Sequence, residues 1–255
     1  MKINAKKLNV CNGVINIFSL TCLLISSTVV AAPDAQSIIK HADRARGGGL
    51  PGIVWNIGLT SRDGDKIAEP QRFQVRAVDA TSVAEVLEPQ RSKGTKLLQV
   101  DHNMWLTRPG LSKPIPISPR QRMSGQASNG DIAATNYAGD YEARLVSEEK
   151  LNGEQCYVLD LTARHKRTTY DKIRYWISVE REVGVRAEFY SLSGKLLKTA
   201  LFKYDNTIEF GGKITPFVSS MVIKDALIDA ETTMKFGTVV VKKIPSSEFD
   251  LGQMQ

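Results

Sequence analysis

Cysteine is scarce in this sequence. Of the three cysteines in 255 residues, Cys11 and Cys22 lie in an N-terminal stretch with the pattern of a cleavable leader, so Cys156 would stand alone in the mature chain. An intrachain disulfide is therefore excluded. Cys156 lies in an alternating strand pattern, which predicts a buried and inert thiol. A chain without cross-links needs a hydrophobic core, and residues 32–255 are long enough to form one within a single domain.

Histidine is equally scarce, and no catalytic motif is present. His41, His102 and His165 are the three histidines; none lies in HExxH, and none has a second His or Cys at ligand spacing. The sequence therefore predicts no zinc site, no other metal and no cofactor. Lipase-type GxSxG, P-loop and dinucleotide-binding fingerprints are absent. Asp101 and His102 are neighbours in the chain and would point to opposite faces of a strand, so they make a poor catalytic pair. No enzyme is predicted.

Positive charge is present but not concentrated. The formal net charge is +7, and three lysines near the N-terminus leave +4 for residues 32–255. This excess is too small and too dispersed for a nucleic-acid binder. Residues 164–167 form a basic turn around His165. That turn is either a solvated loop or a surface that docks an acidic partner or lipid headgroups.

The N-terminus has the layout of a secretory signal peptide. Lysines precede an apolar run at residues 14–30, and small residues follow at Ala31 and Ala32. We expect cleavage between these two alanines, which makes residues 1–31 a signal peptide and residues 32–255 a single domain. The alternative is an uncleaved membrane anchor, for which the apolar run is short.

After a predicted amphipathic helix at residues 34–46, capped by Asp34 and ended by three glycines, strand patterns dominate. The segments with strand character are 53–60, 71–78, 84–88, 96–101, 104–107, 141–147, 155–162, 172–179, 184–190, 196–204, 213–224 and 232–241. Residues 174–198 are the clearest case, because three strands follow one another there through two tight turns and must pair antiparallel. Many sequential hairpins predict an up-and-down sheet that curls on itself.

One segment interrupts the strands. Residues 109–138 contain four prolines and then a stretch rich in Ser, Gly and Asn. Proline cannot donate to a sheet ladder, so a continuous strand is excluded. Residues 131–137 are predicted to form one or two helical turns. Since long irregular excursions from a sheet are usually functional or mobile, we interpret residues 109–138 as a lid over the sheet and name them the cover segment.

Three stretches carry a family resemblance. MWLTRPGLSKPIPIS at 104–118, GDYEARLVSEEKLNGEQCYVLDL at 139–161 and YWISVEREVGVRAEFYSLSGKLLKT at 175–199 resemble the periplasmic outer-membrane lipoprotein-sorting proteins, the broad group of LolA-like and LolB-like carriers. KIPSSEF at 243–249 also fits the group. The resemblance extends from about Trp55 to Leu251.

This resemblance implies a mainly β fold: a curved antiparallel sheet forming a half-open β-barrel of about 11 strands, with a few short helices as lid or plug. It further implies a periplasmic carrier or chaperone whose apolar cavity binds the acyl chains of a lipid or lipoprotein. We expect this carrier to be a monomer. Some members accompany lipid-exporting transporters, so an inner-membrane exporter is an expected partner. The family supplies no catalytic residues.

Large apolar side chains on the sheet and the cover segment are the candidate ligand contacts. They are Trp105, Ile115, Ile117, Met123, Tyr141, Phe217 and Met221. Met and aromatic side chains suit apolar surfaces that accept flexible ligands, although such residues also form ordinary cores. Two alternatives to a carrier stay open: an adaptor that docks on a membrane transporter and carries nothing, and a small-molecule enzyme on the same scaffold.

Overall fold

A computed structural model describes residue 1, residues 33–133 and residues 136–253. The predicted signal peptide, apart from Met1, lies outside these residues. Residues from Pro33 onward form one compact unit. In the portion that the structure describes, no helix has the length and apolar character needed to cross a bilayer.

The predicted N-terminal helix is confirmed as α1 (Ala35–Arg44). The side chain of Asp34 caps it by accepting hydrogen bonds from the backbone amides of Gln36, at 3.2 Å, and Ser37, at 3.0 Å. One face of the helix buries Ile39 and Ala42. The helix therefore forms because a capping carboxylate precedes a ten-residue segment that carries an apolar stripe.

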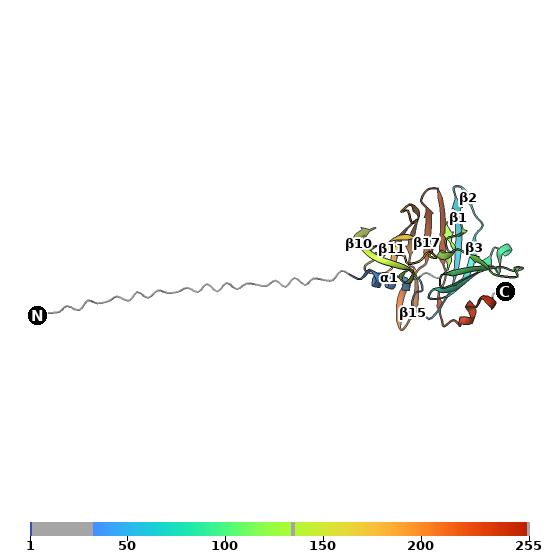
Figure 1. The fold of residues 1–255 in the computed structure, drawn as a ribbon, viewed down its shortest axis with the longest axis horizontal. Helices are drawn as coiled ribbons and strands as arrows, with labels where there is room; N and C mark the ends of the chain where they lie inside the picture. The colour runs from blue at the N-terminus through green and yellow to red at the C-terminus, as the bar shows by residue number, and fades with distance from the viewer. Residues whose placement is uncertain (2–32, 134–135, 254–255) are drawn as a thin grey trace. The chain divides into compact units, whose positions relative to one another are not determined.

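Strands make up most of the described chain (Figure 1). Those of the first half are β1 (Ile53–Asp63), β2 (Lys66–Ile67), β3 (Gln71–Val78), β4 (Thr81–Glu88), β5 (Lys96–Val100), β6 (Asn103–Thr107), β7 (Ile115–Ile117), β8 (Arg122–Ser124) and β9 (Ala127–Ser128). Those of the second half are β10 (Tyr141–Leu151), β11 (Glu154–Ala163), β12 (Lys172–Ser178), β13 (Gly184–Tyr190), β14 (Leu196–Lys203), β15 (Asn206–Phe210), β16 (Lys213–Phe217), β17 (Ser220–Asp225), β18 (Ala230–Phe236) and β19 (Val240–Val241).

One large antiparallel sheet dominates the fold. It contains 15 of these strands, in the order β10-β11-β12-β13-β14-β17-β18-β1-β3-β4-β5-β6-β7, with β2 and β19 beside β1. Its two halves are meanders joined where β1 pairs with β18, with Ile57 opposite Phe236. The sheet does not close, because β10 and β7 are its two ends. The predicted fold class, a mainly β, half-open curved sheet, is confirmed, as are the sequential strands β12, β13 and β14.

Two predicted strands are each divided in the structure. Residues 213–224 form β16 and β17, and β16 pairs with β15 in a separate hairpin that the sequence did not reveal. The division falls where the amide of Val218 donates to the carbonyl of Ala45 at 2.9 Å and so leaves the ladder. Residues 232–241 likewise form β18 and β19, with the amide of Gly237 bonded to the carbonyl of Asn56.

Side-chain alternation places apolar residues on both faces of the sheet. We call the face that carries the main cluster the inner face; it includes Ile57, Phe73, Tyr175 and Phe189, all nearly inaccessible to solvent. A smaller outer cluster lies on the other face, where short turns of η2 (Ser246–Phe249) cover it. Two neighbouring residues of β4 show this alternation, because Val83 belongs to the outer cluster and Ala84 belongs to the main cluster.

Candidate functional site

The cover segment runs between the two ends of the open sheet. It extends one end as β7, which pairs with β6, and it leads into β10 at the other end. Between these strands lie the hairpin β8–β9 and the short helices α2 (Asn129–Ile132) and α3 (Tyr137–Asp140). Pro116 is tolerated in β7 because an edge strand leaves one side of its backbone unpaired.

The underside of the cover segment is apolar and packs on the inner face. Ala127, Ile132 and Tyr137 are buried members of the main cluster, together with Ile39 and Ala42 of α1. The same hydrophobic cluster thus joins sheet, cover segment and α1. Burial of this apolar area is the main force that holds the cover segment down.

A buried lysine fixes the hairpin β8–β9 to the sheet. Lys198 of β14 is 5 % exposed, and its ammonium donates hydrogen bonds to the carbonyl of Gln126 and to Oγ of Ser128, the latter at 2.9 Å. Burial lowers the pKa of Lys198, while the nearby Asp131 carboxylate opposes that shift. A charge in this position needs all its partners, so the contact is both specific and costly to break.

The tip of the same hairpin rests on β1 and β18. Thr232 Oγ1 accepts a hydrogen bond from the amide of Gln126 at 2.7 Å and lies 2.9 Å from Oγ of Ser61. Gly125 has φ of 54°, and a Cβ there would lie 2.3 Å from both hydroxyl oxygens. Glycine is thus required by both backbone conformation and space.

Further polar contacts secure α2 and the rim. Asp131 accepts hydrogen bonds from the amide of Ser128 and the hydroxyl of Tyr170, each at 2.8 Å. Burial, and then the Asp131 charge, raises the pKa of Tyr170. At the rim, ion pairs join Arg120 to Asp171, at 2.7 Å, and Arg122 to Asp225, at 3.0 Å.

The C-terminal end of the cover segment is held by α1. Oδ2 of Asp43, which is 3 % exposed, accepts a hydrogen bond from the amide of Ala138 at 2.7 Å. Burial raises the pKa of Asp43 to about 7, against the lowering effects of that amide and of Arg46. The Arg46 guanidinium lies 5.1 Å from the ring centroids of both Tyr137 and Phe202, where cation–π attraction is effective.

The structure brings most of the predicted ligand contacts together. Those in the main cluster or packed against it are Ile117, Met123, Tyr141, Phe217 and Met221. The other two lie apart from it. Trp105 packs in the outer cluster, and Ile115 of β7 is 47 % exposed. All seven stay predictions as ligand contacts, and the five inner ones now share a surface.

The inner face is closed and filled by its own side chains in this structure. Tyr141, Phe217 and Met221 are each at most 1 % exposed. A groove of about 580 Å³ lies elsewhere, over β10 to β13, and charged residues such as Arg144, Asp160 and Arg174 line it. That lining does not suit an acyl chain. In this structure the cover segment and α1 pack on the inner face.

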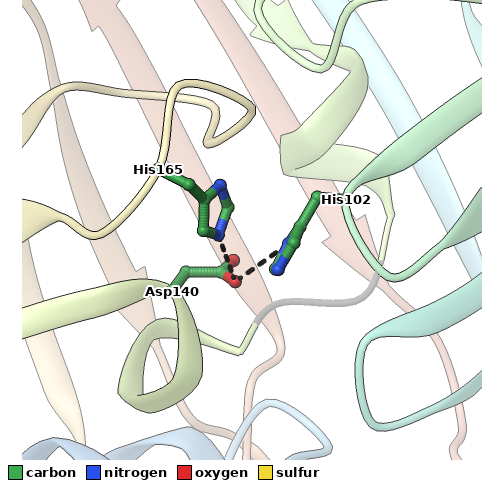
Figure 2. Close-up of side chains that lie close together, drawn as sticks. All are labelled: His102, Asp140 and His165. Atoms are coloured by element: carbon green, nitrogen blue, oxygen red, sulfur yellow. Dashed lines mark ion pairs between the residues drawn. The ribbon is translucent and has the colours of Figure 1, made fainter.

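Sequence reasoning missed one polar cluster, which Figure 2 shows. His102 comes from the turn between β5 and β6, Asp140 ends α3, and His165 follows β11. The two imidazole rings lie 3.6 Å apart between centroids. Burial, together with His102, lowers the pKa of His165, and burial raises the pKa of Asp140. Spacing along the chain could not reveal the cluster, because its three residues come from separate parts of the chain: a turn, the end of α3 and the segment after β11.

An open antiparallel sheet with helices and a crossing segment over its apolar face defines a half-open β-barrel. A family model described as "Uncharacterized protein" matches residues 79–255. A LolA superfamily protein from Nitrosomonas europaea is 31% identical in sequence, with a TM-score of 0.77; the match covers 86% of this chain and 98% of that one. The chain belongs to the LolA superfamily.

Two further solved structures share the fold at lower identity. A DUF1329 family protein from Desulfovibrio piger is 19% identical, with a TM-score of 0.72 over 88% of this chain and 100% of that one. A putative outer membrane lipoprotein-sorting protein domain from Vibrio parahaemolyticus is 18% identical, with a TM-score of 0.72 over 86% of this chain and 97% of that one. A comparison with curated proteins finds no match.

Proposed function

We propose that this protein is a periplasmic, non-enzymatic carrier that binds acyl chains of a lipid or lipoprotein against the inner face of its sheet. The observation that carries the proposal is the apolar inner face of an open sheet, covered by a crossing segment and α1 rather than by more strands. Membership of the LolA superfamily supports it. Delivery to a lipid-exporting transporter and a monomeric state stay predictions from the family resemblance.

The cover segment is the part that would open. Its hydrogen bonds to Lys198 and its ion pairs at the rim are discrete contacts that can break without disturbing the ladder of the main sheet. Lifting it exposes apolar surface, and an acyl chain entering there restores burial at about 0.8 kcal/mol per methylene. A long chain therefore offsets the loss of the cover segment's own contacts and the ordering cost of binding.

A polar donor on the inner face fits such a ligand. Trp55 of β1 is 5 % exposed within the main cluster, and its indole Nε1 has no hydrogen-bond partner among the described residues. A buried donor without an acceptor is unfavourable, so a ligand carbonyl that accepts a hydrogen bond from Nε1 of Trp55 would stabilise the complex. Ester or amide carbonyls adjoin the acyl chains of lipids and lipoproteins.

The three tryptophans supply a matched test. Trp55 belongs to the main cluster, Trp105 to the outer cluster, and Trp176 to a third cluster with Cys156 and Val158. We would prepare three variants, each keeping one tryptophan and carrying Phe at the other two positions. Each would be titrated with a phospholipid brominated along its acyl chains, because bromine quenches indole fluorescence only at close range.

We expect quenching in the variant that keeps Trp55 and little in the variant that keeps Trp176. Quenching in the variant that keeps Trp105 would support the predicted ligand contact of that residue. Equal quenching of all three would mean adsorption to the surface, and no quenching of Trp55 would refute binding at the inner face. Extraction of the natively purified protein, followed by mass spectrometry of its lipids, would identify the cargo. Cross-linking to a transporter without lipid exchange between vesicles would favour the adaptor instead.

A further inference from the structure

The cluster of His102, Asp140 and His165 bridges the two ends of the open sheet. His102 lies beside β6, which pairs with the end strand β7. Asp140 immediately precedes the other end strand, β10, and His165 follows its neighbour, β11. Arg167 makes the same crossing, since its Nη1 donates to Oδ1 of Asn103 at 2.8 Å. These turns therefore meet across the side where the barrel is not closed.

The distances within the cluster suit a shared ion better than hydrogen bonds. Oδ1 of Asp140 lies 3.5 Å from Nδ1 of His102 and 3.6 Å from Nε2 of His165. The three residues each offer a ligand atom, and these atoms all lie within 4.8 Å of one another. Strong hydrogen bonds to a carboxylate are shorter, at about 2.7–2.9 Å. Ligand atoms held about 2.0–2.1 Å from a tetrahedral ion are separated by about 3.3 Å.

The same atoms lack other partners. Within the described part of the chain, Oδ1 of Asp140 and both ring nitrogens of His165 are buried without a hydrogen bond. Such atoms are costly to bury, so an occupant is expected. A cavity of about 20 Å³ lies alongside, lined by His102 and Asp140 among others. This volume suffices for one ion or one water molecule.

We propose that Nδ1 of His102, Oδ1 of Asp140 and Nε2 of His165 bind one divalent transition-metal ion, with Zn²⁺ the best match. Two imidazoles and one carboxylate are ligands that Zn²⁺ favours, whereas Mg²⁺ and Ca²⁺ prefer oxygen alone. Three protein ligands leave a fourth position for water or another group. The ion would tie one end of the sheet to the other. This site is independent of whether the protein carries acyl chains.

Zinc binding would be measured on the full chain, purified without a histidine tag and stripped of metal. Calorimetric titration with Zn²⁺ should give one ion per chain. H102A and H165A should each weaken binding by about tenfold or more, as loss of one of three ligands requires. His41 provides the control, because it too faces a carboxylate, Glu182, at 3.3 Å. H41A should bind zinc within about twofold of the natural protein.

Several results would overturn the site. They are the absence of tight Zn²⁺ binding, undiminished binding by H165A, or an equal loss in H41A. Circular dichroism would establish that each variant is folded. If the variants unfold, X-ray absorption spectroscopy of the Zn²⁺-loaded natural protein would count the imidazole ligands of the ion. Two imidazole ligands would support the site, and any other number would refute it.

Discussion

Replacing Asp43 by Asn should remove a pH dependence from the stability of this protein. Asp43 is buried in α1 and accepts the hydrogen bond of the Ala138 amide, so it joins α1 to the end of the cover segment. The pKa of its carboxyl is raised from 3.8 to about 7 by burial. Asparagine keeps an acceptor of the same shape but cannot ionise.

The sign follows from proton uptake. Between pH 3.8 and about 7 the folded chain holds a proton on Asp43 that the unfolded chain has lost. The free energy of unfolding therefore falls as the pH rises through this window and levels off above it. At about 1.4 kcal/mol per pKa unit, the full difference is about 4 kcal/mol, and this is an upper bound where partial opening admits water.

Urea unfolding followed by tryptophan fluorescence, at a series of pH values from about 4 to about 8, measures the effect. D43N should gain stability relative to the natural protein as the pH rises, by up to about 4 kcal/mol across the range. D65N, at an exposed turn, controls for the loss of one negative charge. Parallel pH profiles for D43N and the natural protein would show that Asp43 does not titrate in this window.

Two further substitutions test how the cover segment and the sheet are held. K198M should lower the free energy of unfolding by about 1–3 kcal/mol and speed hydrogen exchange in the hairpin β8–β9, because Gln126 and Ser128 lose their hydrogen-bond donor. The control K203M, at an exposed position of the same strand, should change neither quantity. Unchanged hydrogen exchange in K198M would contradict the role of Lys198. In thermal melts G184A should be destabilised by about 1–3 kcal/mol, since its Cβ would lie 1.8 Å from the hydroxyl of Tyr175. The control G58A has open space at its Cβ and should be neutral or slightly more stable. Equal melting temperatures for the two variants would refute this packing.

Local features of the fold could be predicted from the sequence. A capping carboxylate and an apolar stripe predicted α1, and alternation between turn residues predicted β3 and β13 at the bounds that the structure has. Alternation depends only on neighbouring residues, so it is read directly from the chain. It did not predict the divisions after Phe217 and Phe236, because backbone bonds to distant residues create them. It also missed β15, which pairs with its neighbour β16 in a local hairpin.

The candidate site depended more on tertiary structure. Alternation shows that Trp105 and Leu106 point to opposite faces, but it does not show which face is inner, and Leu106 is the one that packs against the main cluster. Ile115, a predicted ligand contact on the cover segment, lies in an edge strand and is exposed, and alternation alone does not show this. His102 and His165 meet only because the open sheet brings its two ends together, which no spacing rule could reveal.

The pairing of β1 with β18 has a consequence for the order of folding. A polypeptide that is secreted N-terminus first can pair β1 with β3 early, while the other edge of β1 waits for residues near the end of the chain. Until then a long apolar strand offers an unpaired backbone to any extended segment nearby. The meander from β10 to β14 meets no such delay. Arrival of β18 is therefore expected to limit the folding rate, and aggregation to compete most strongly just before it.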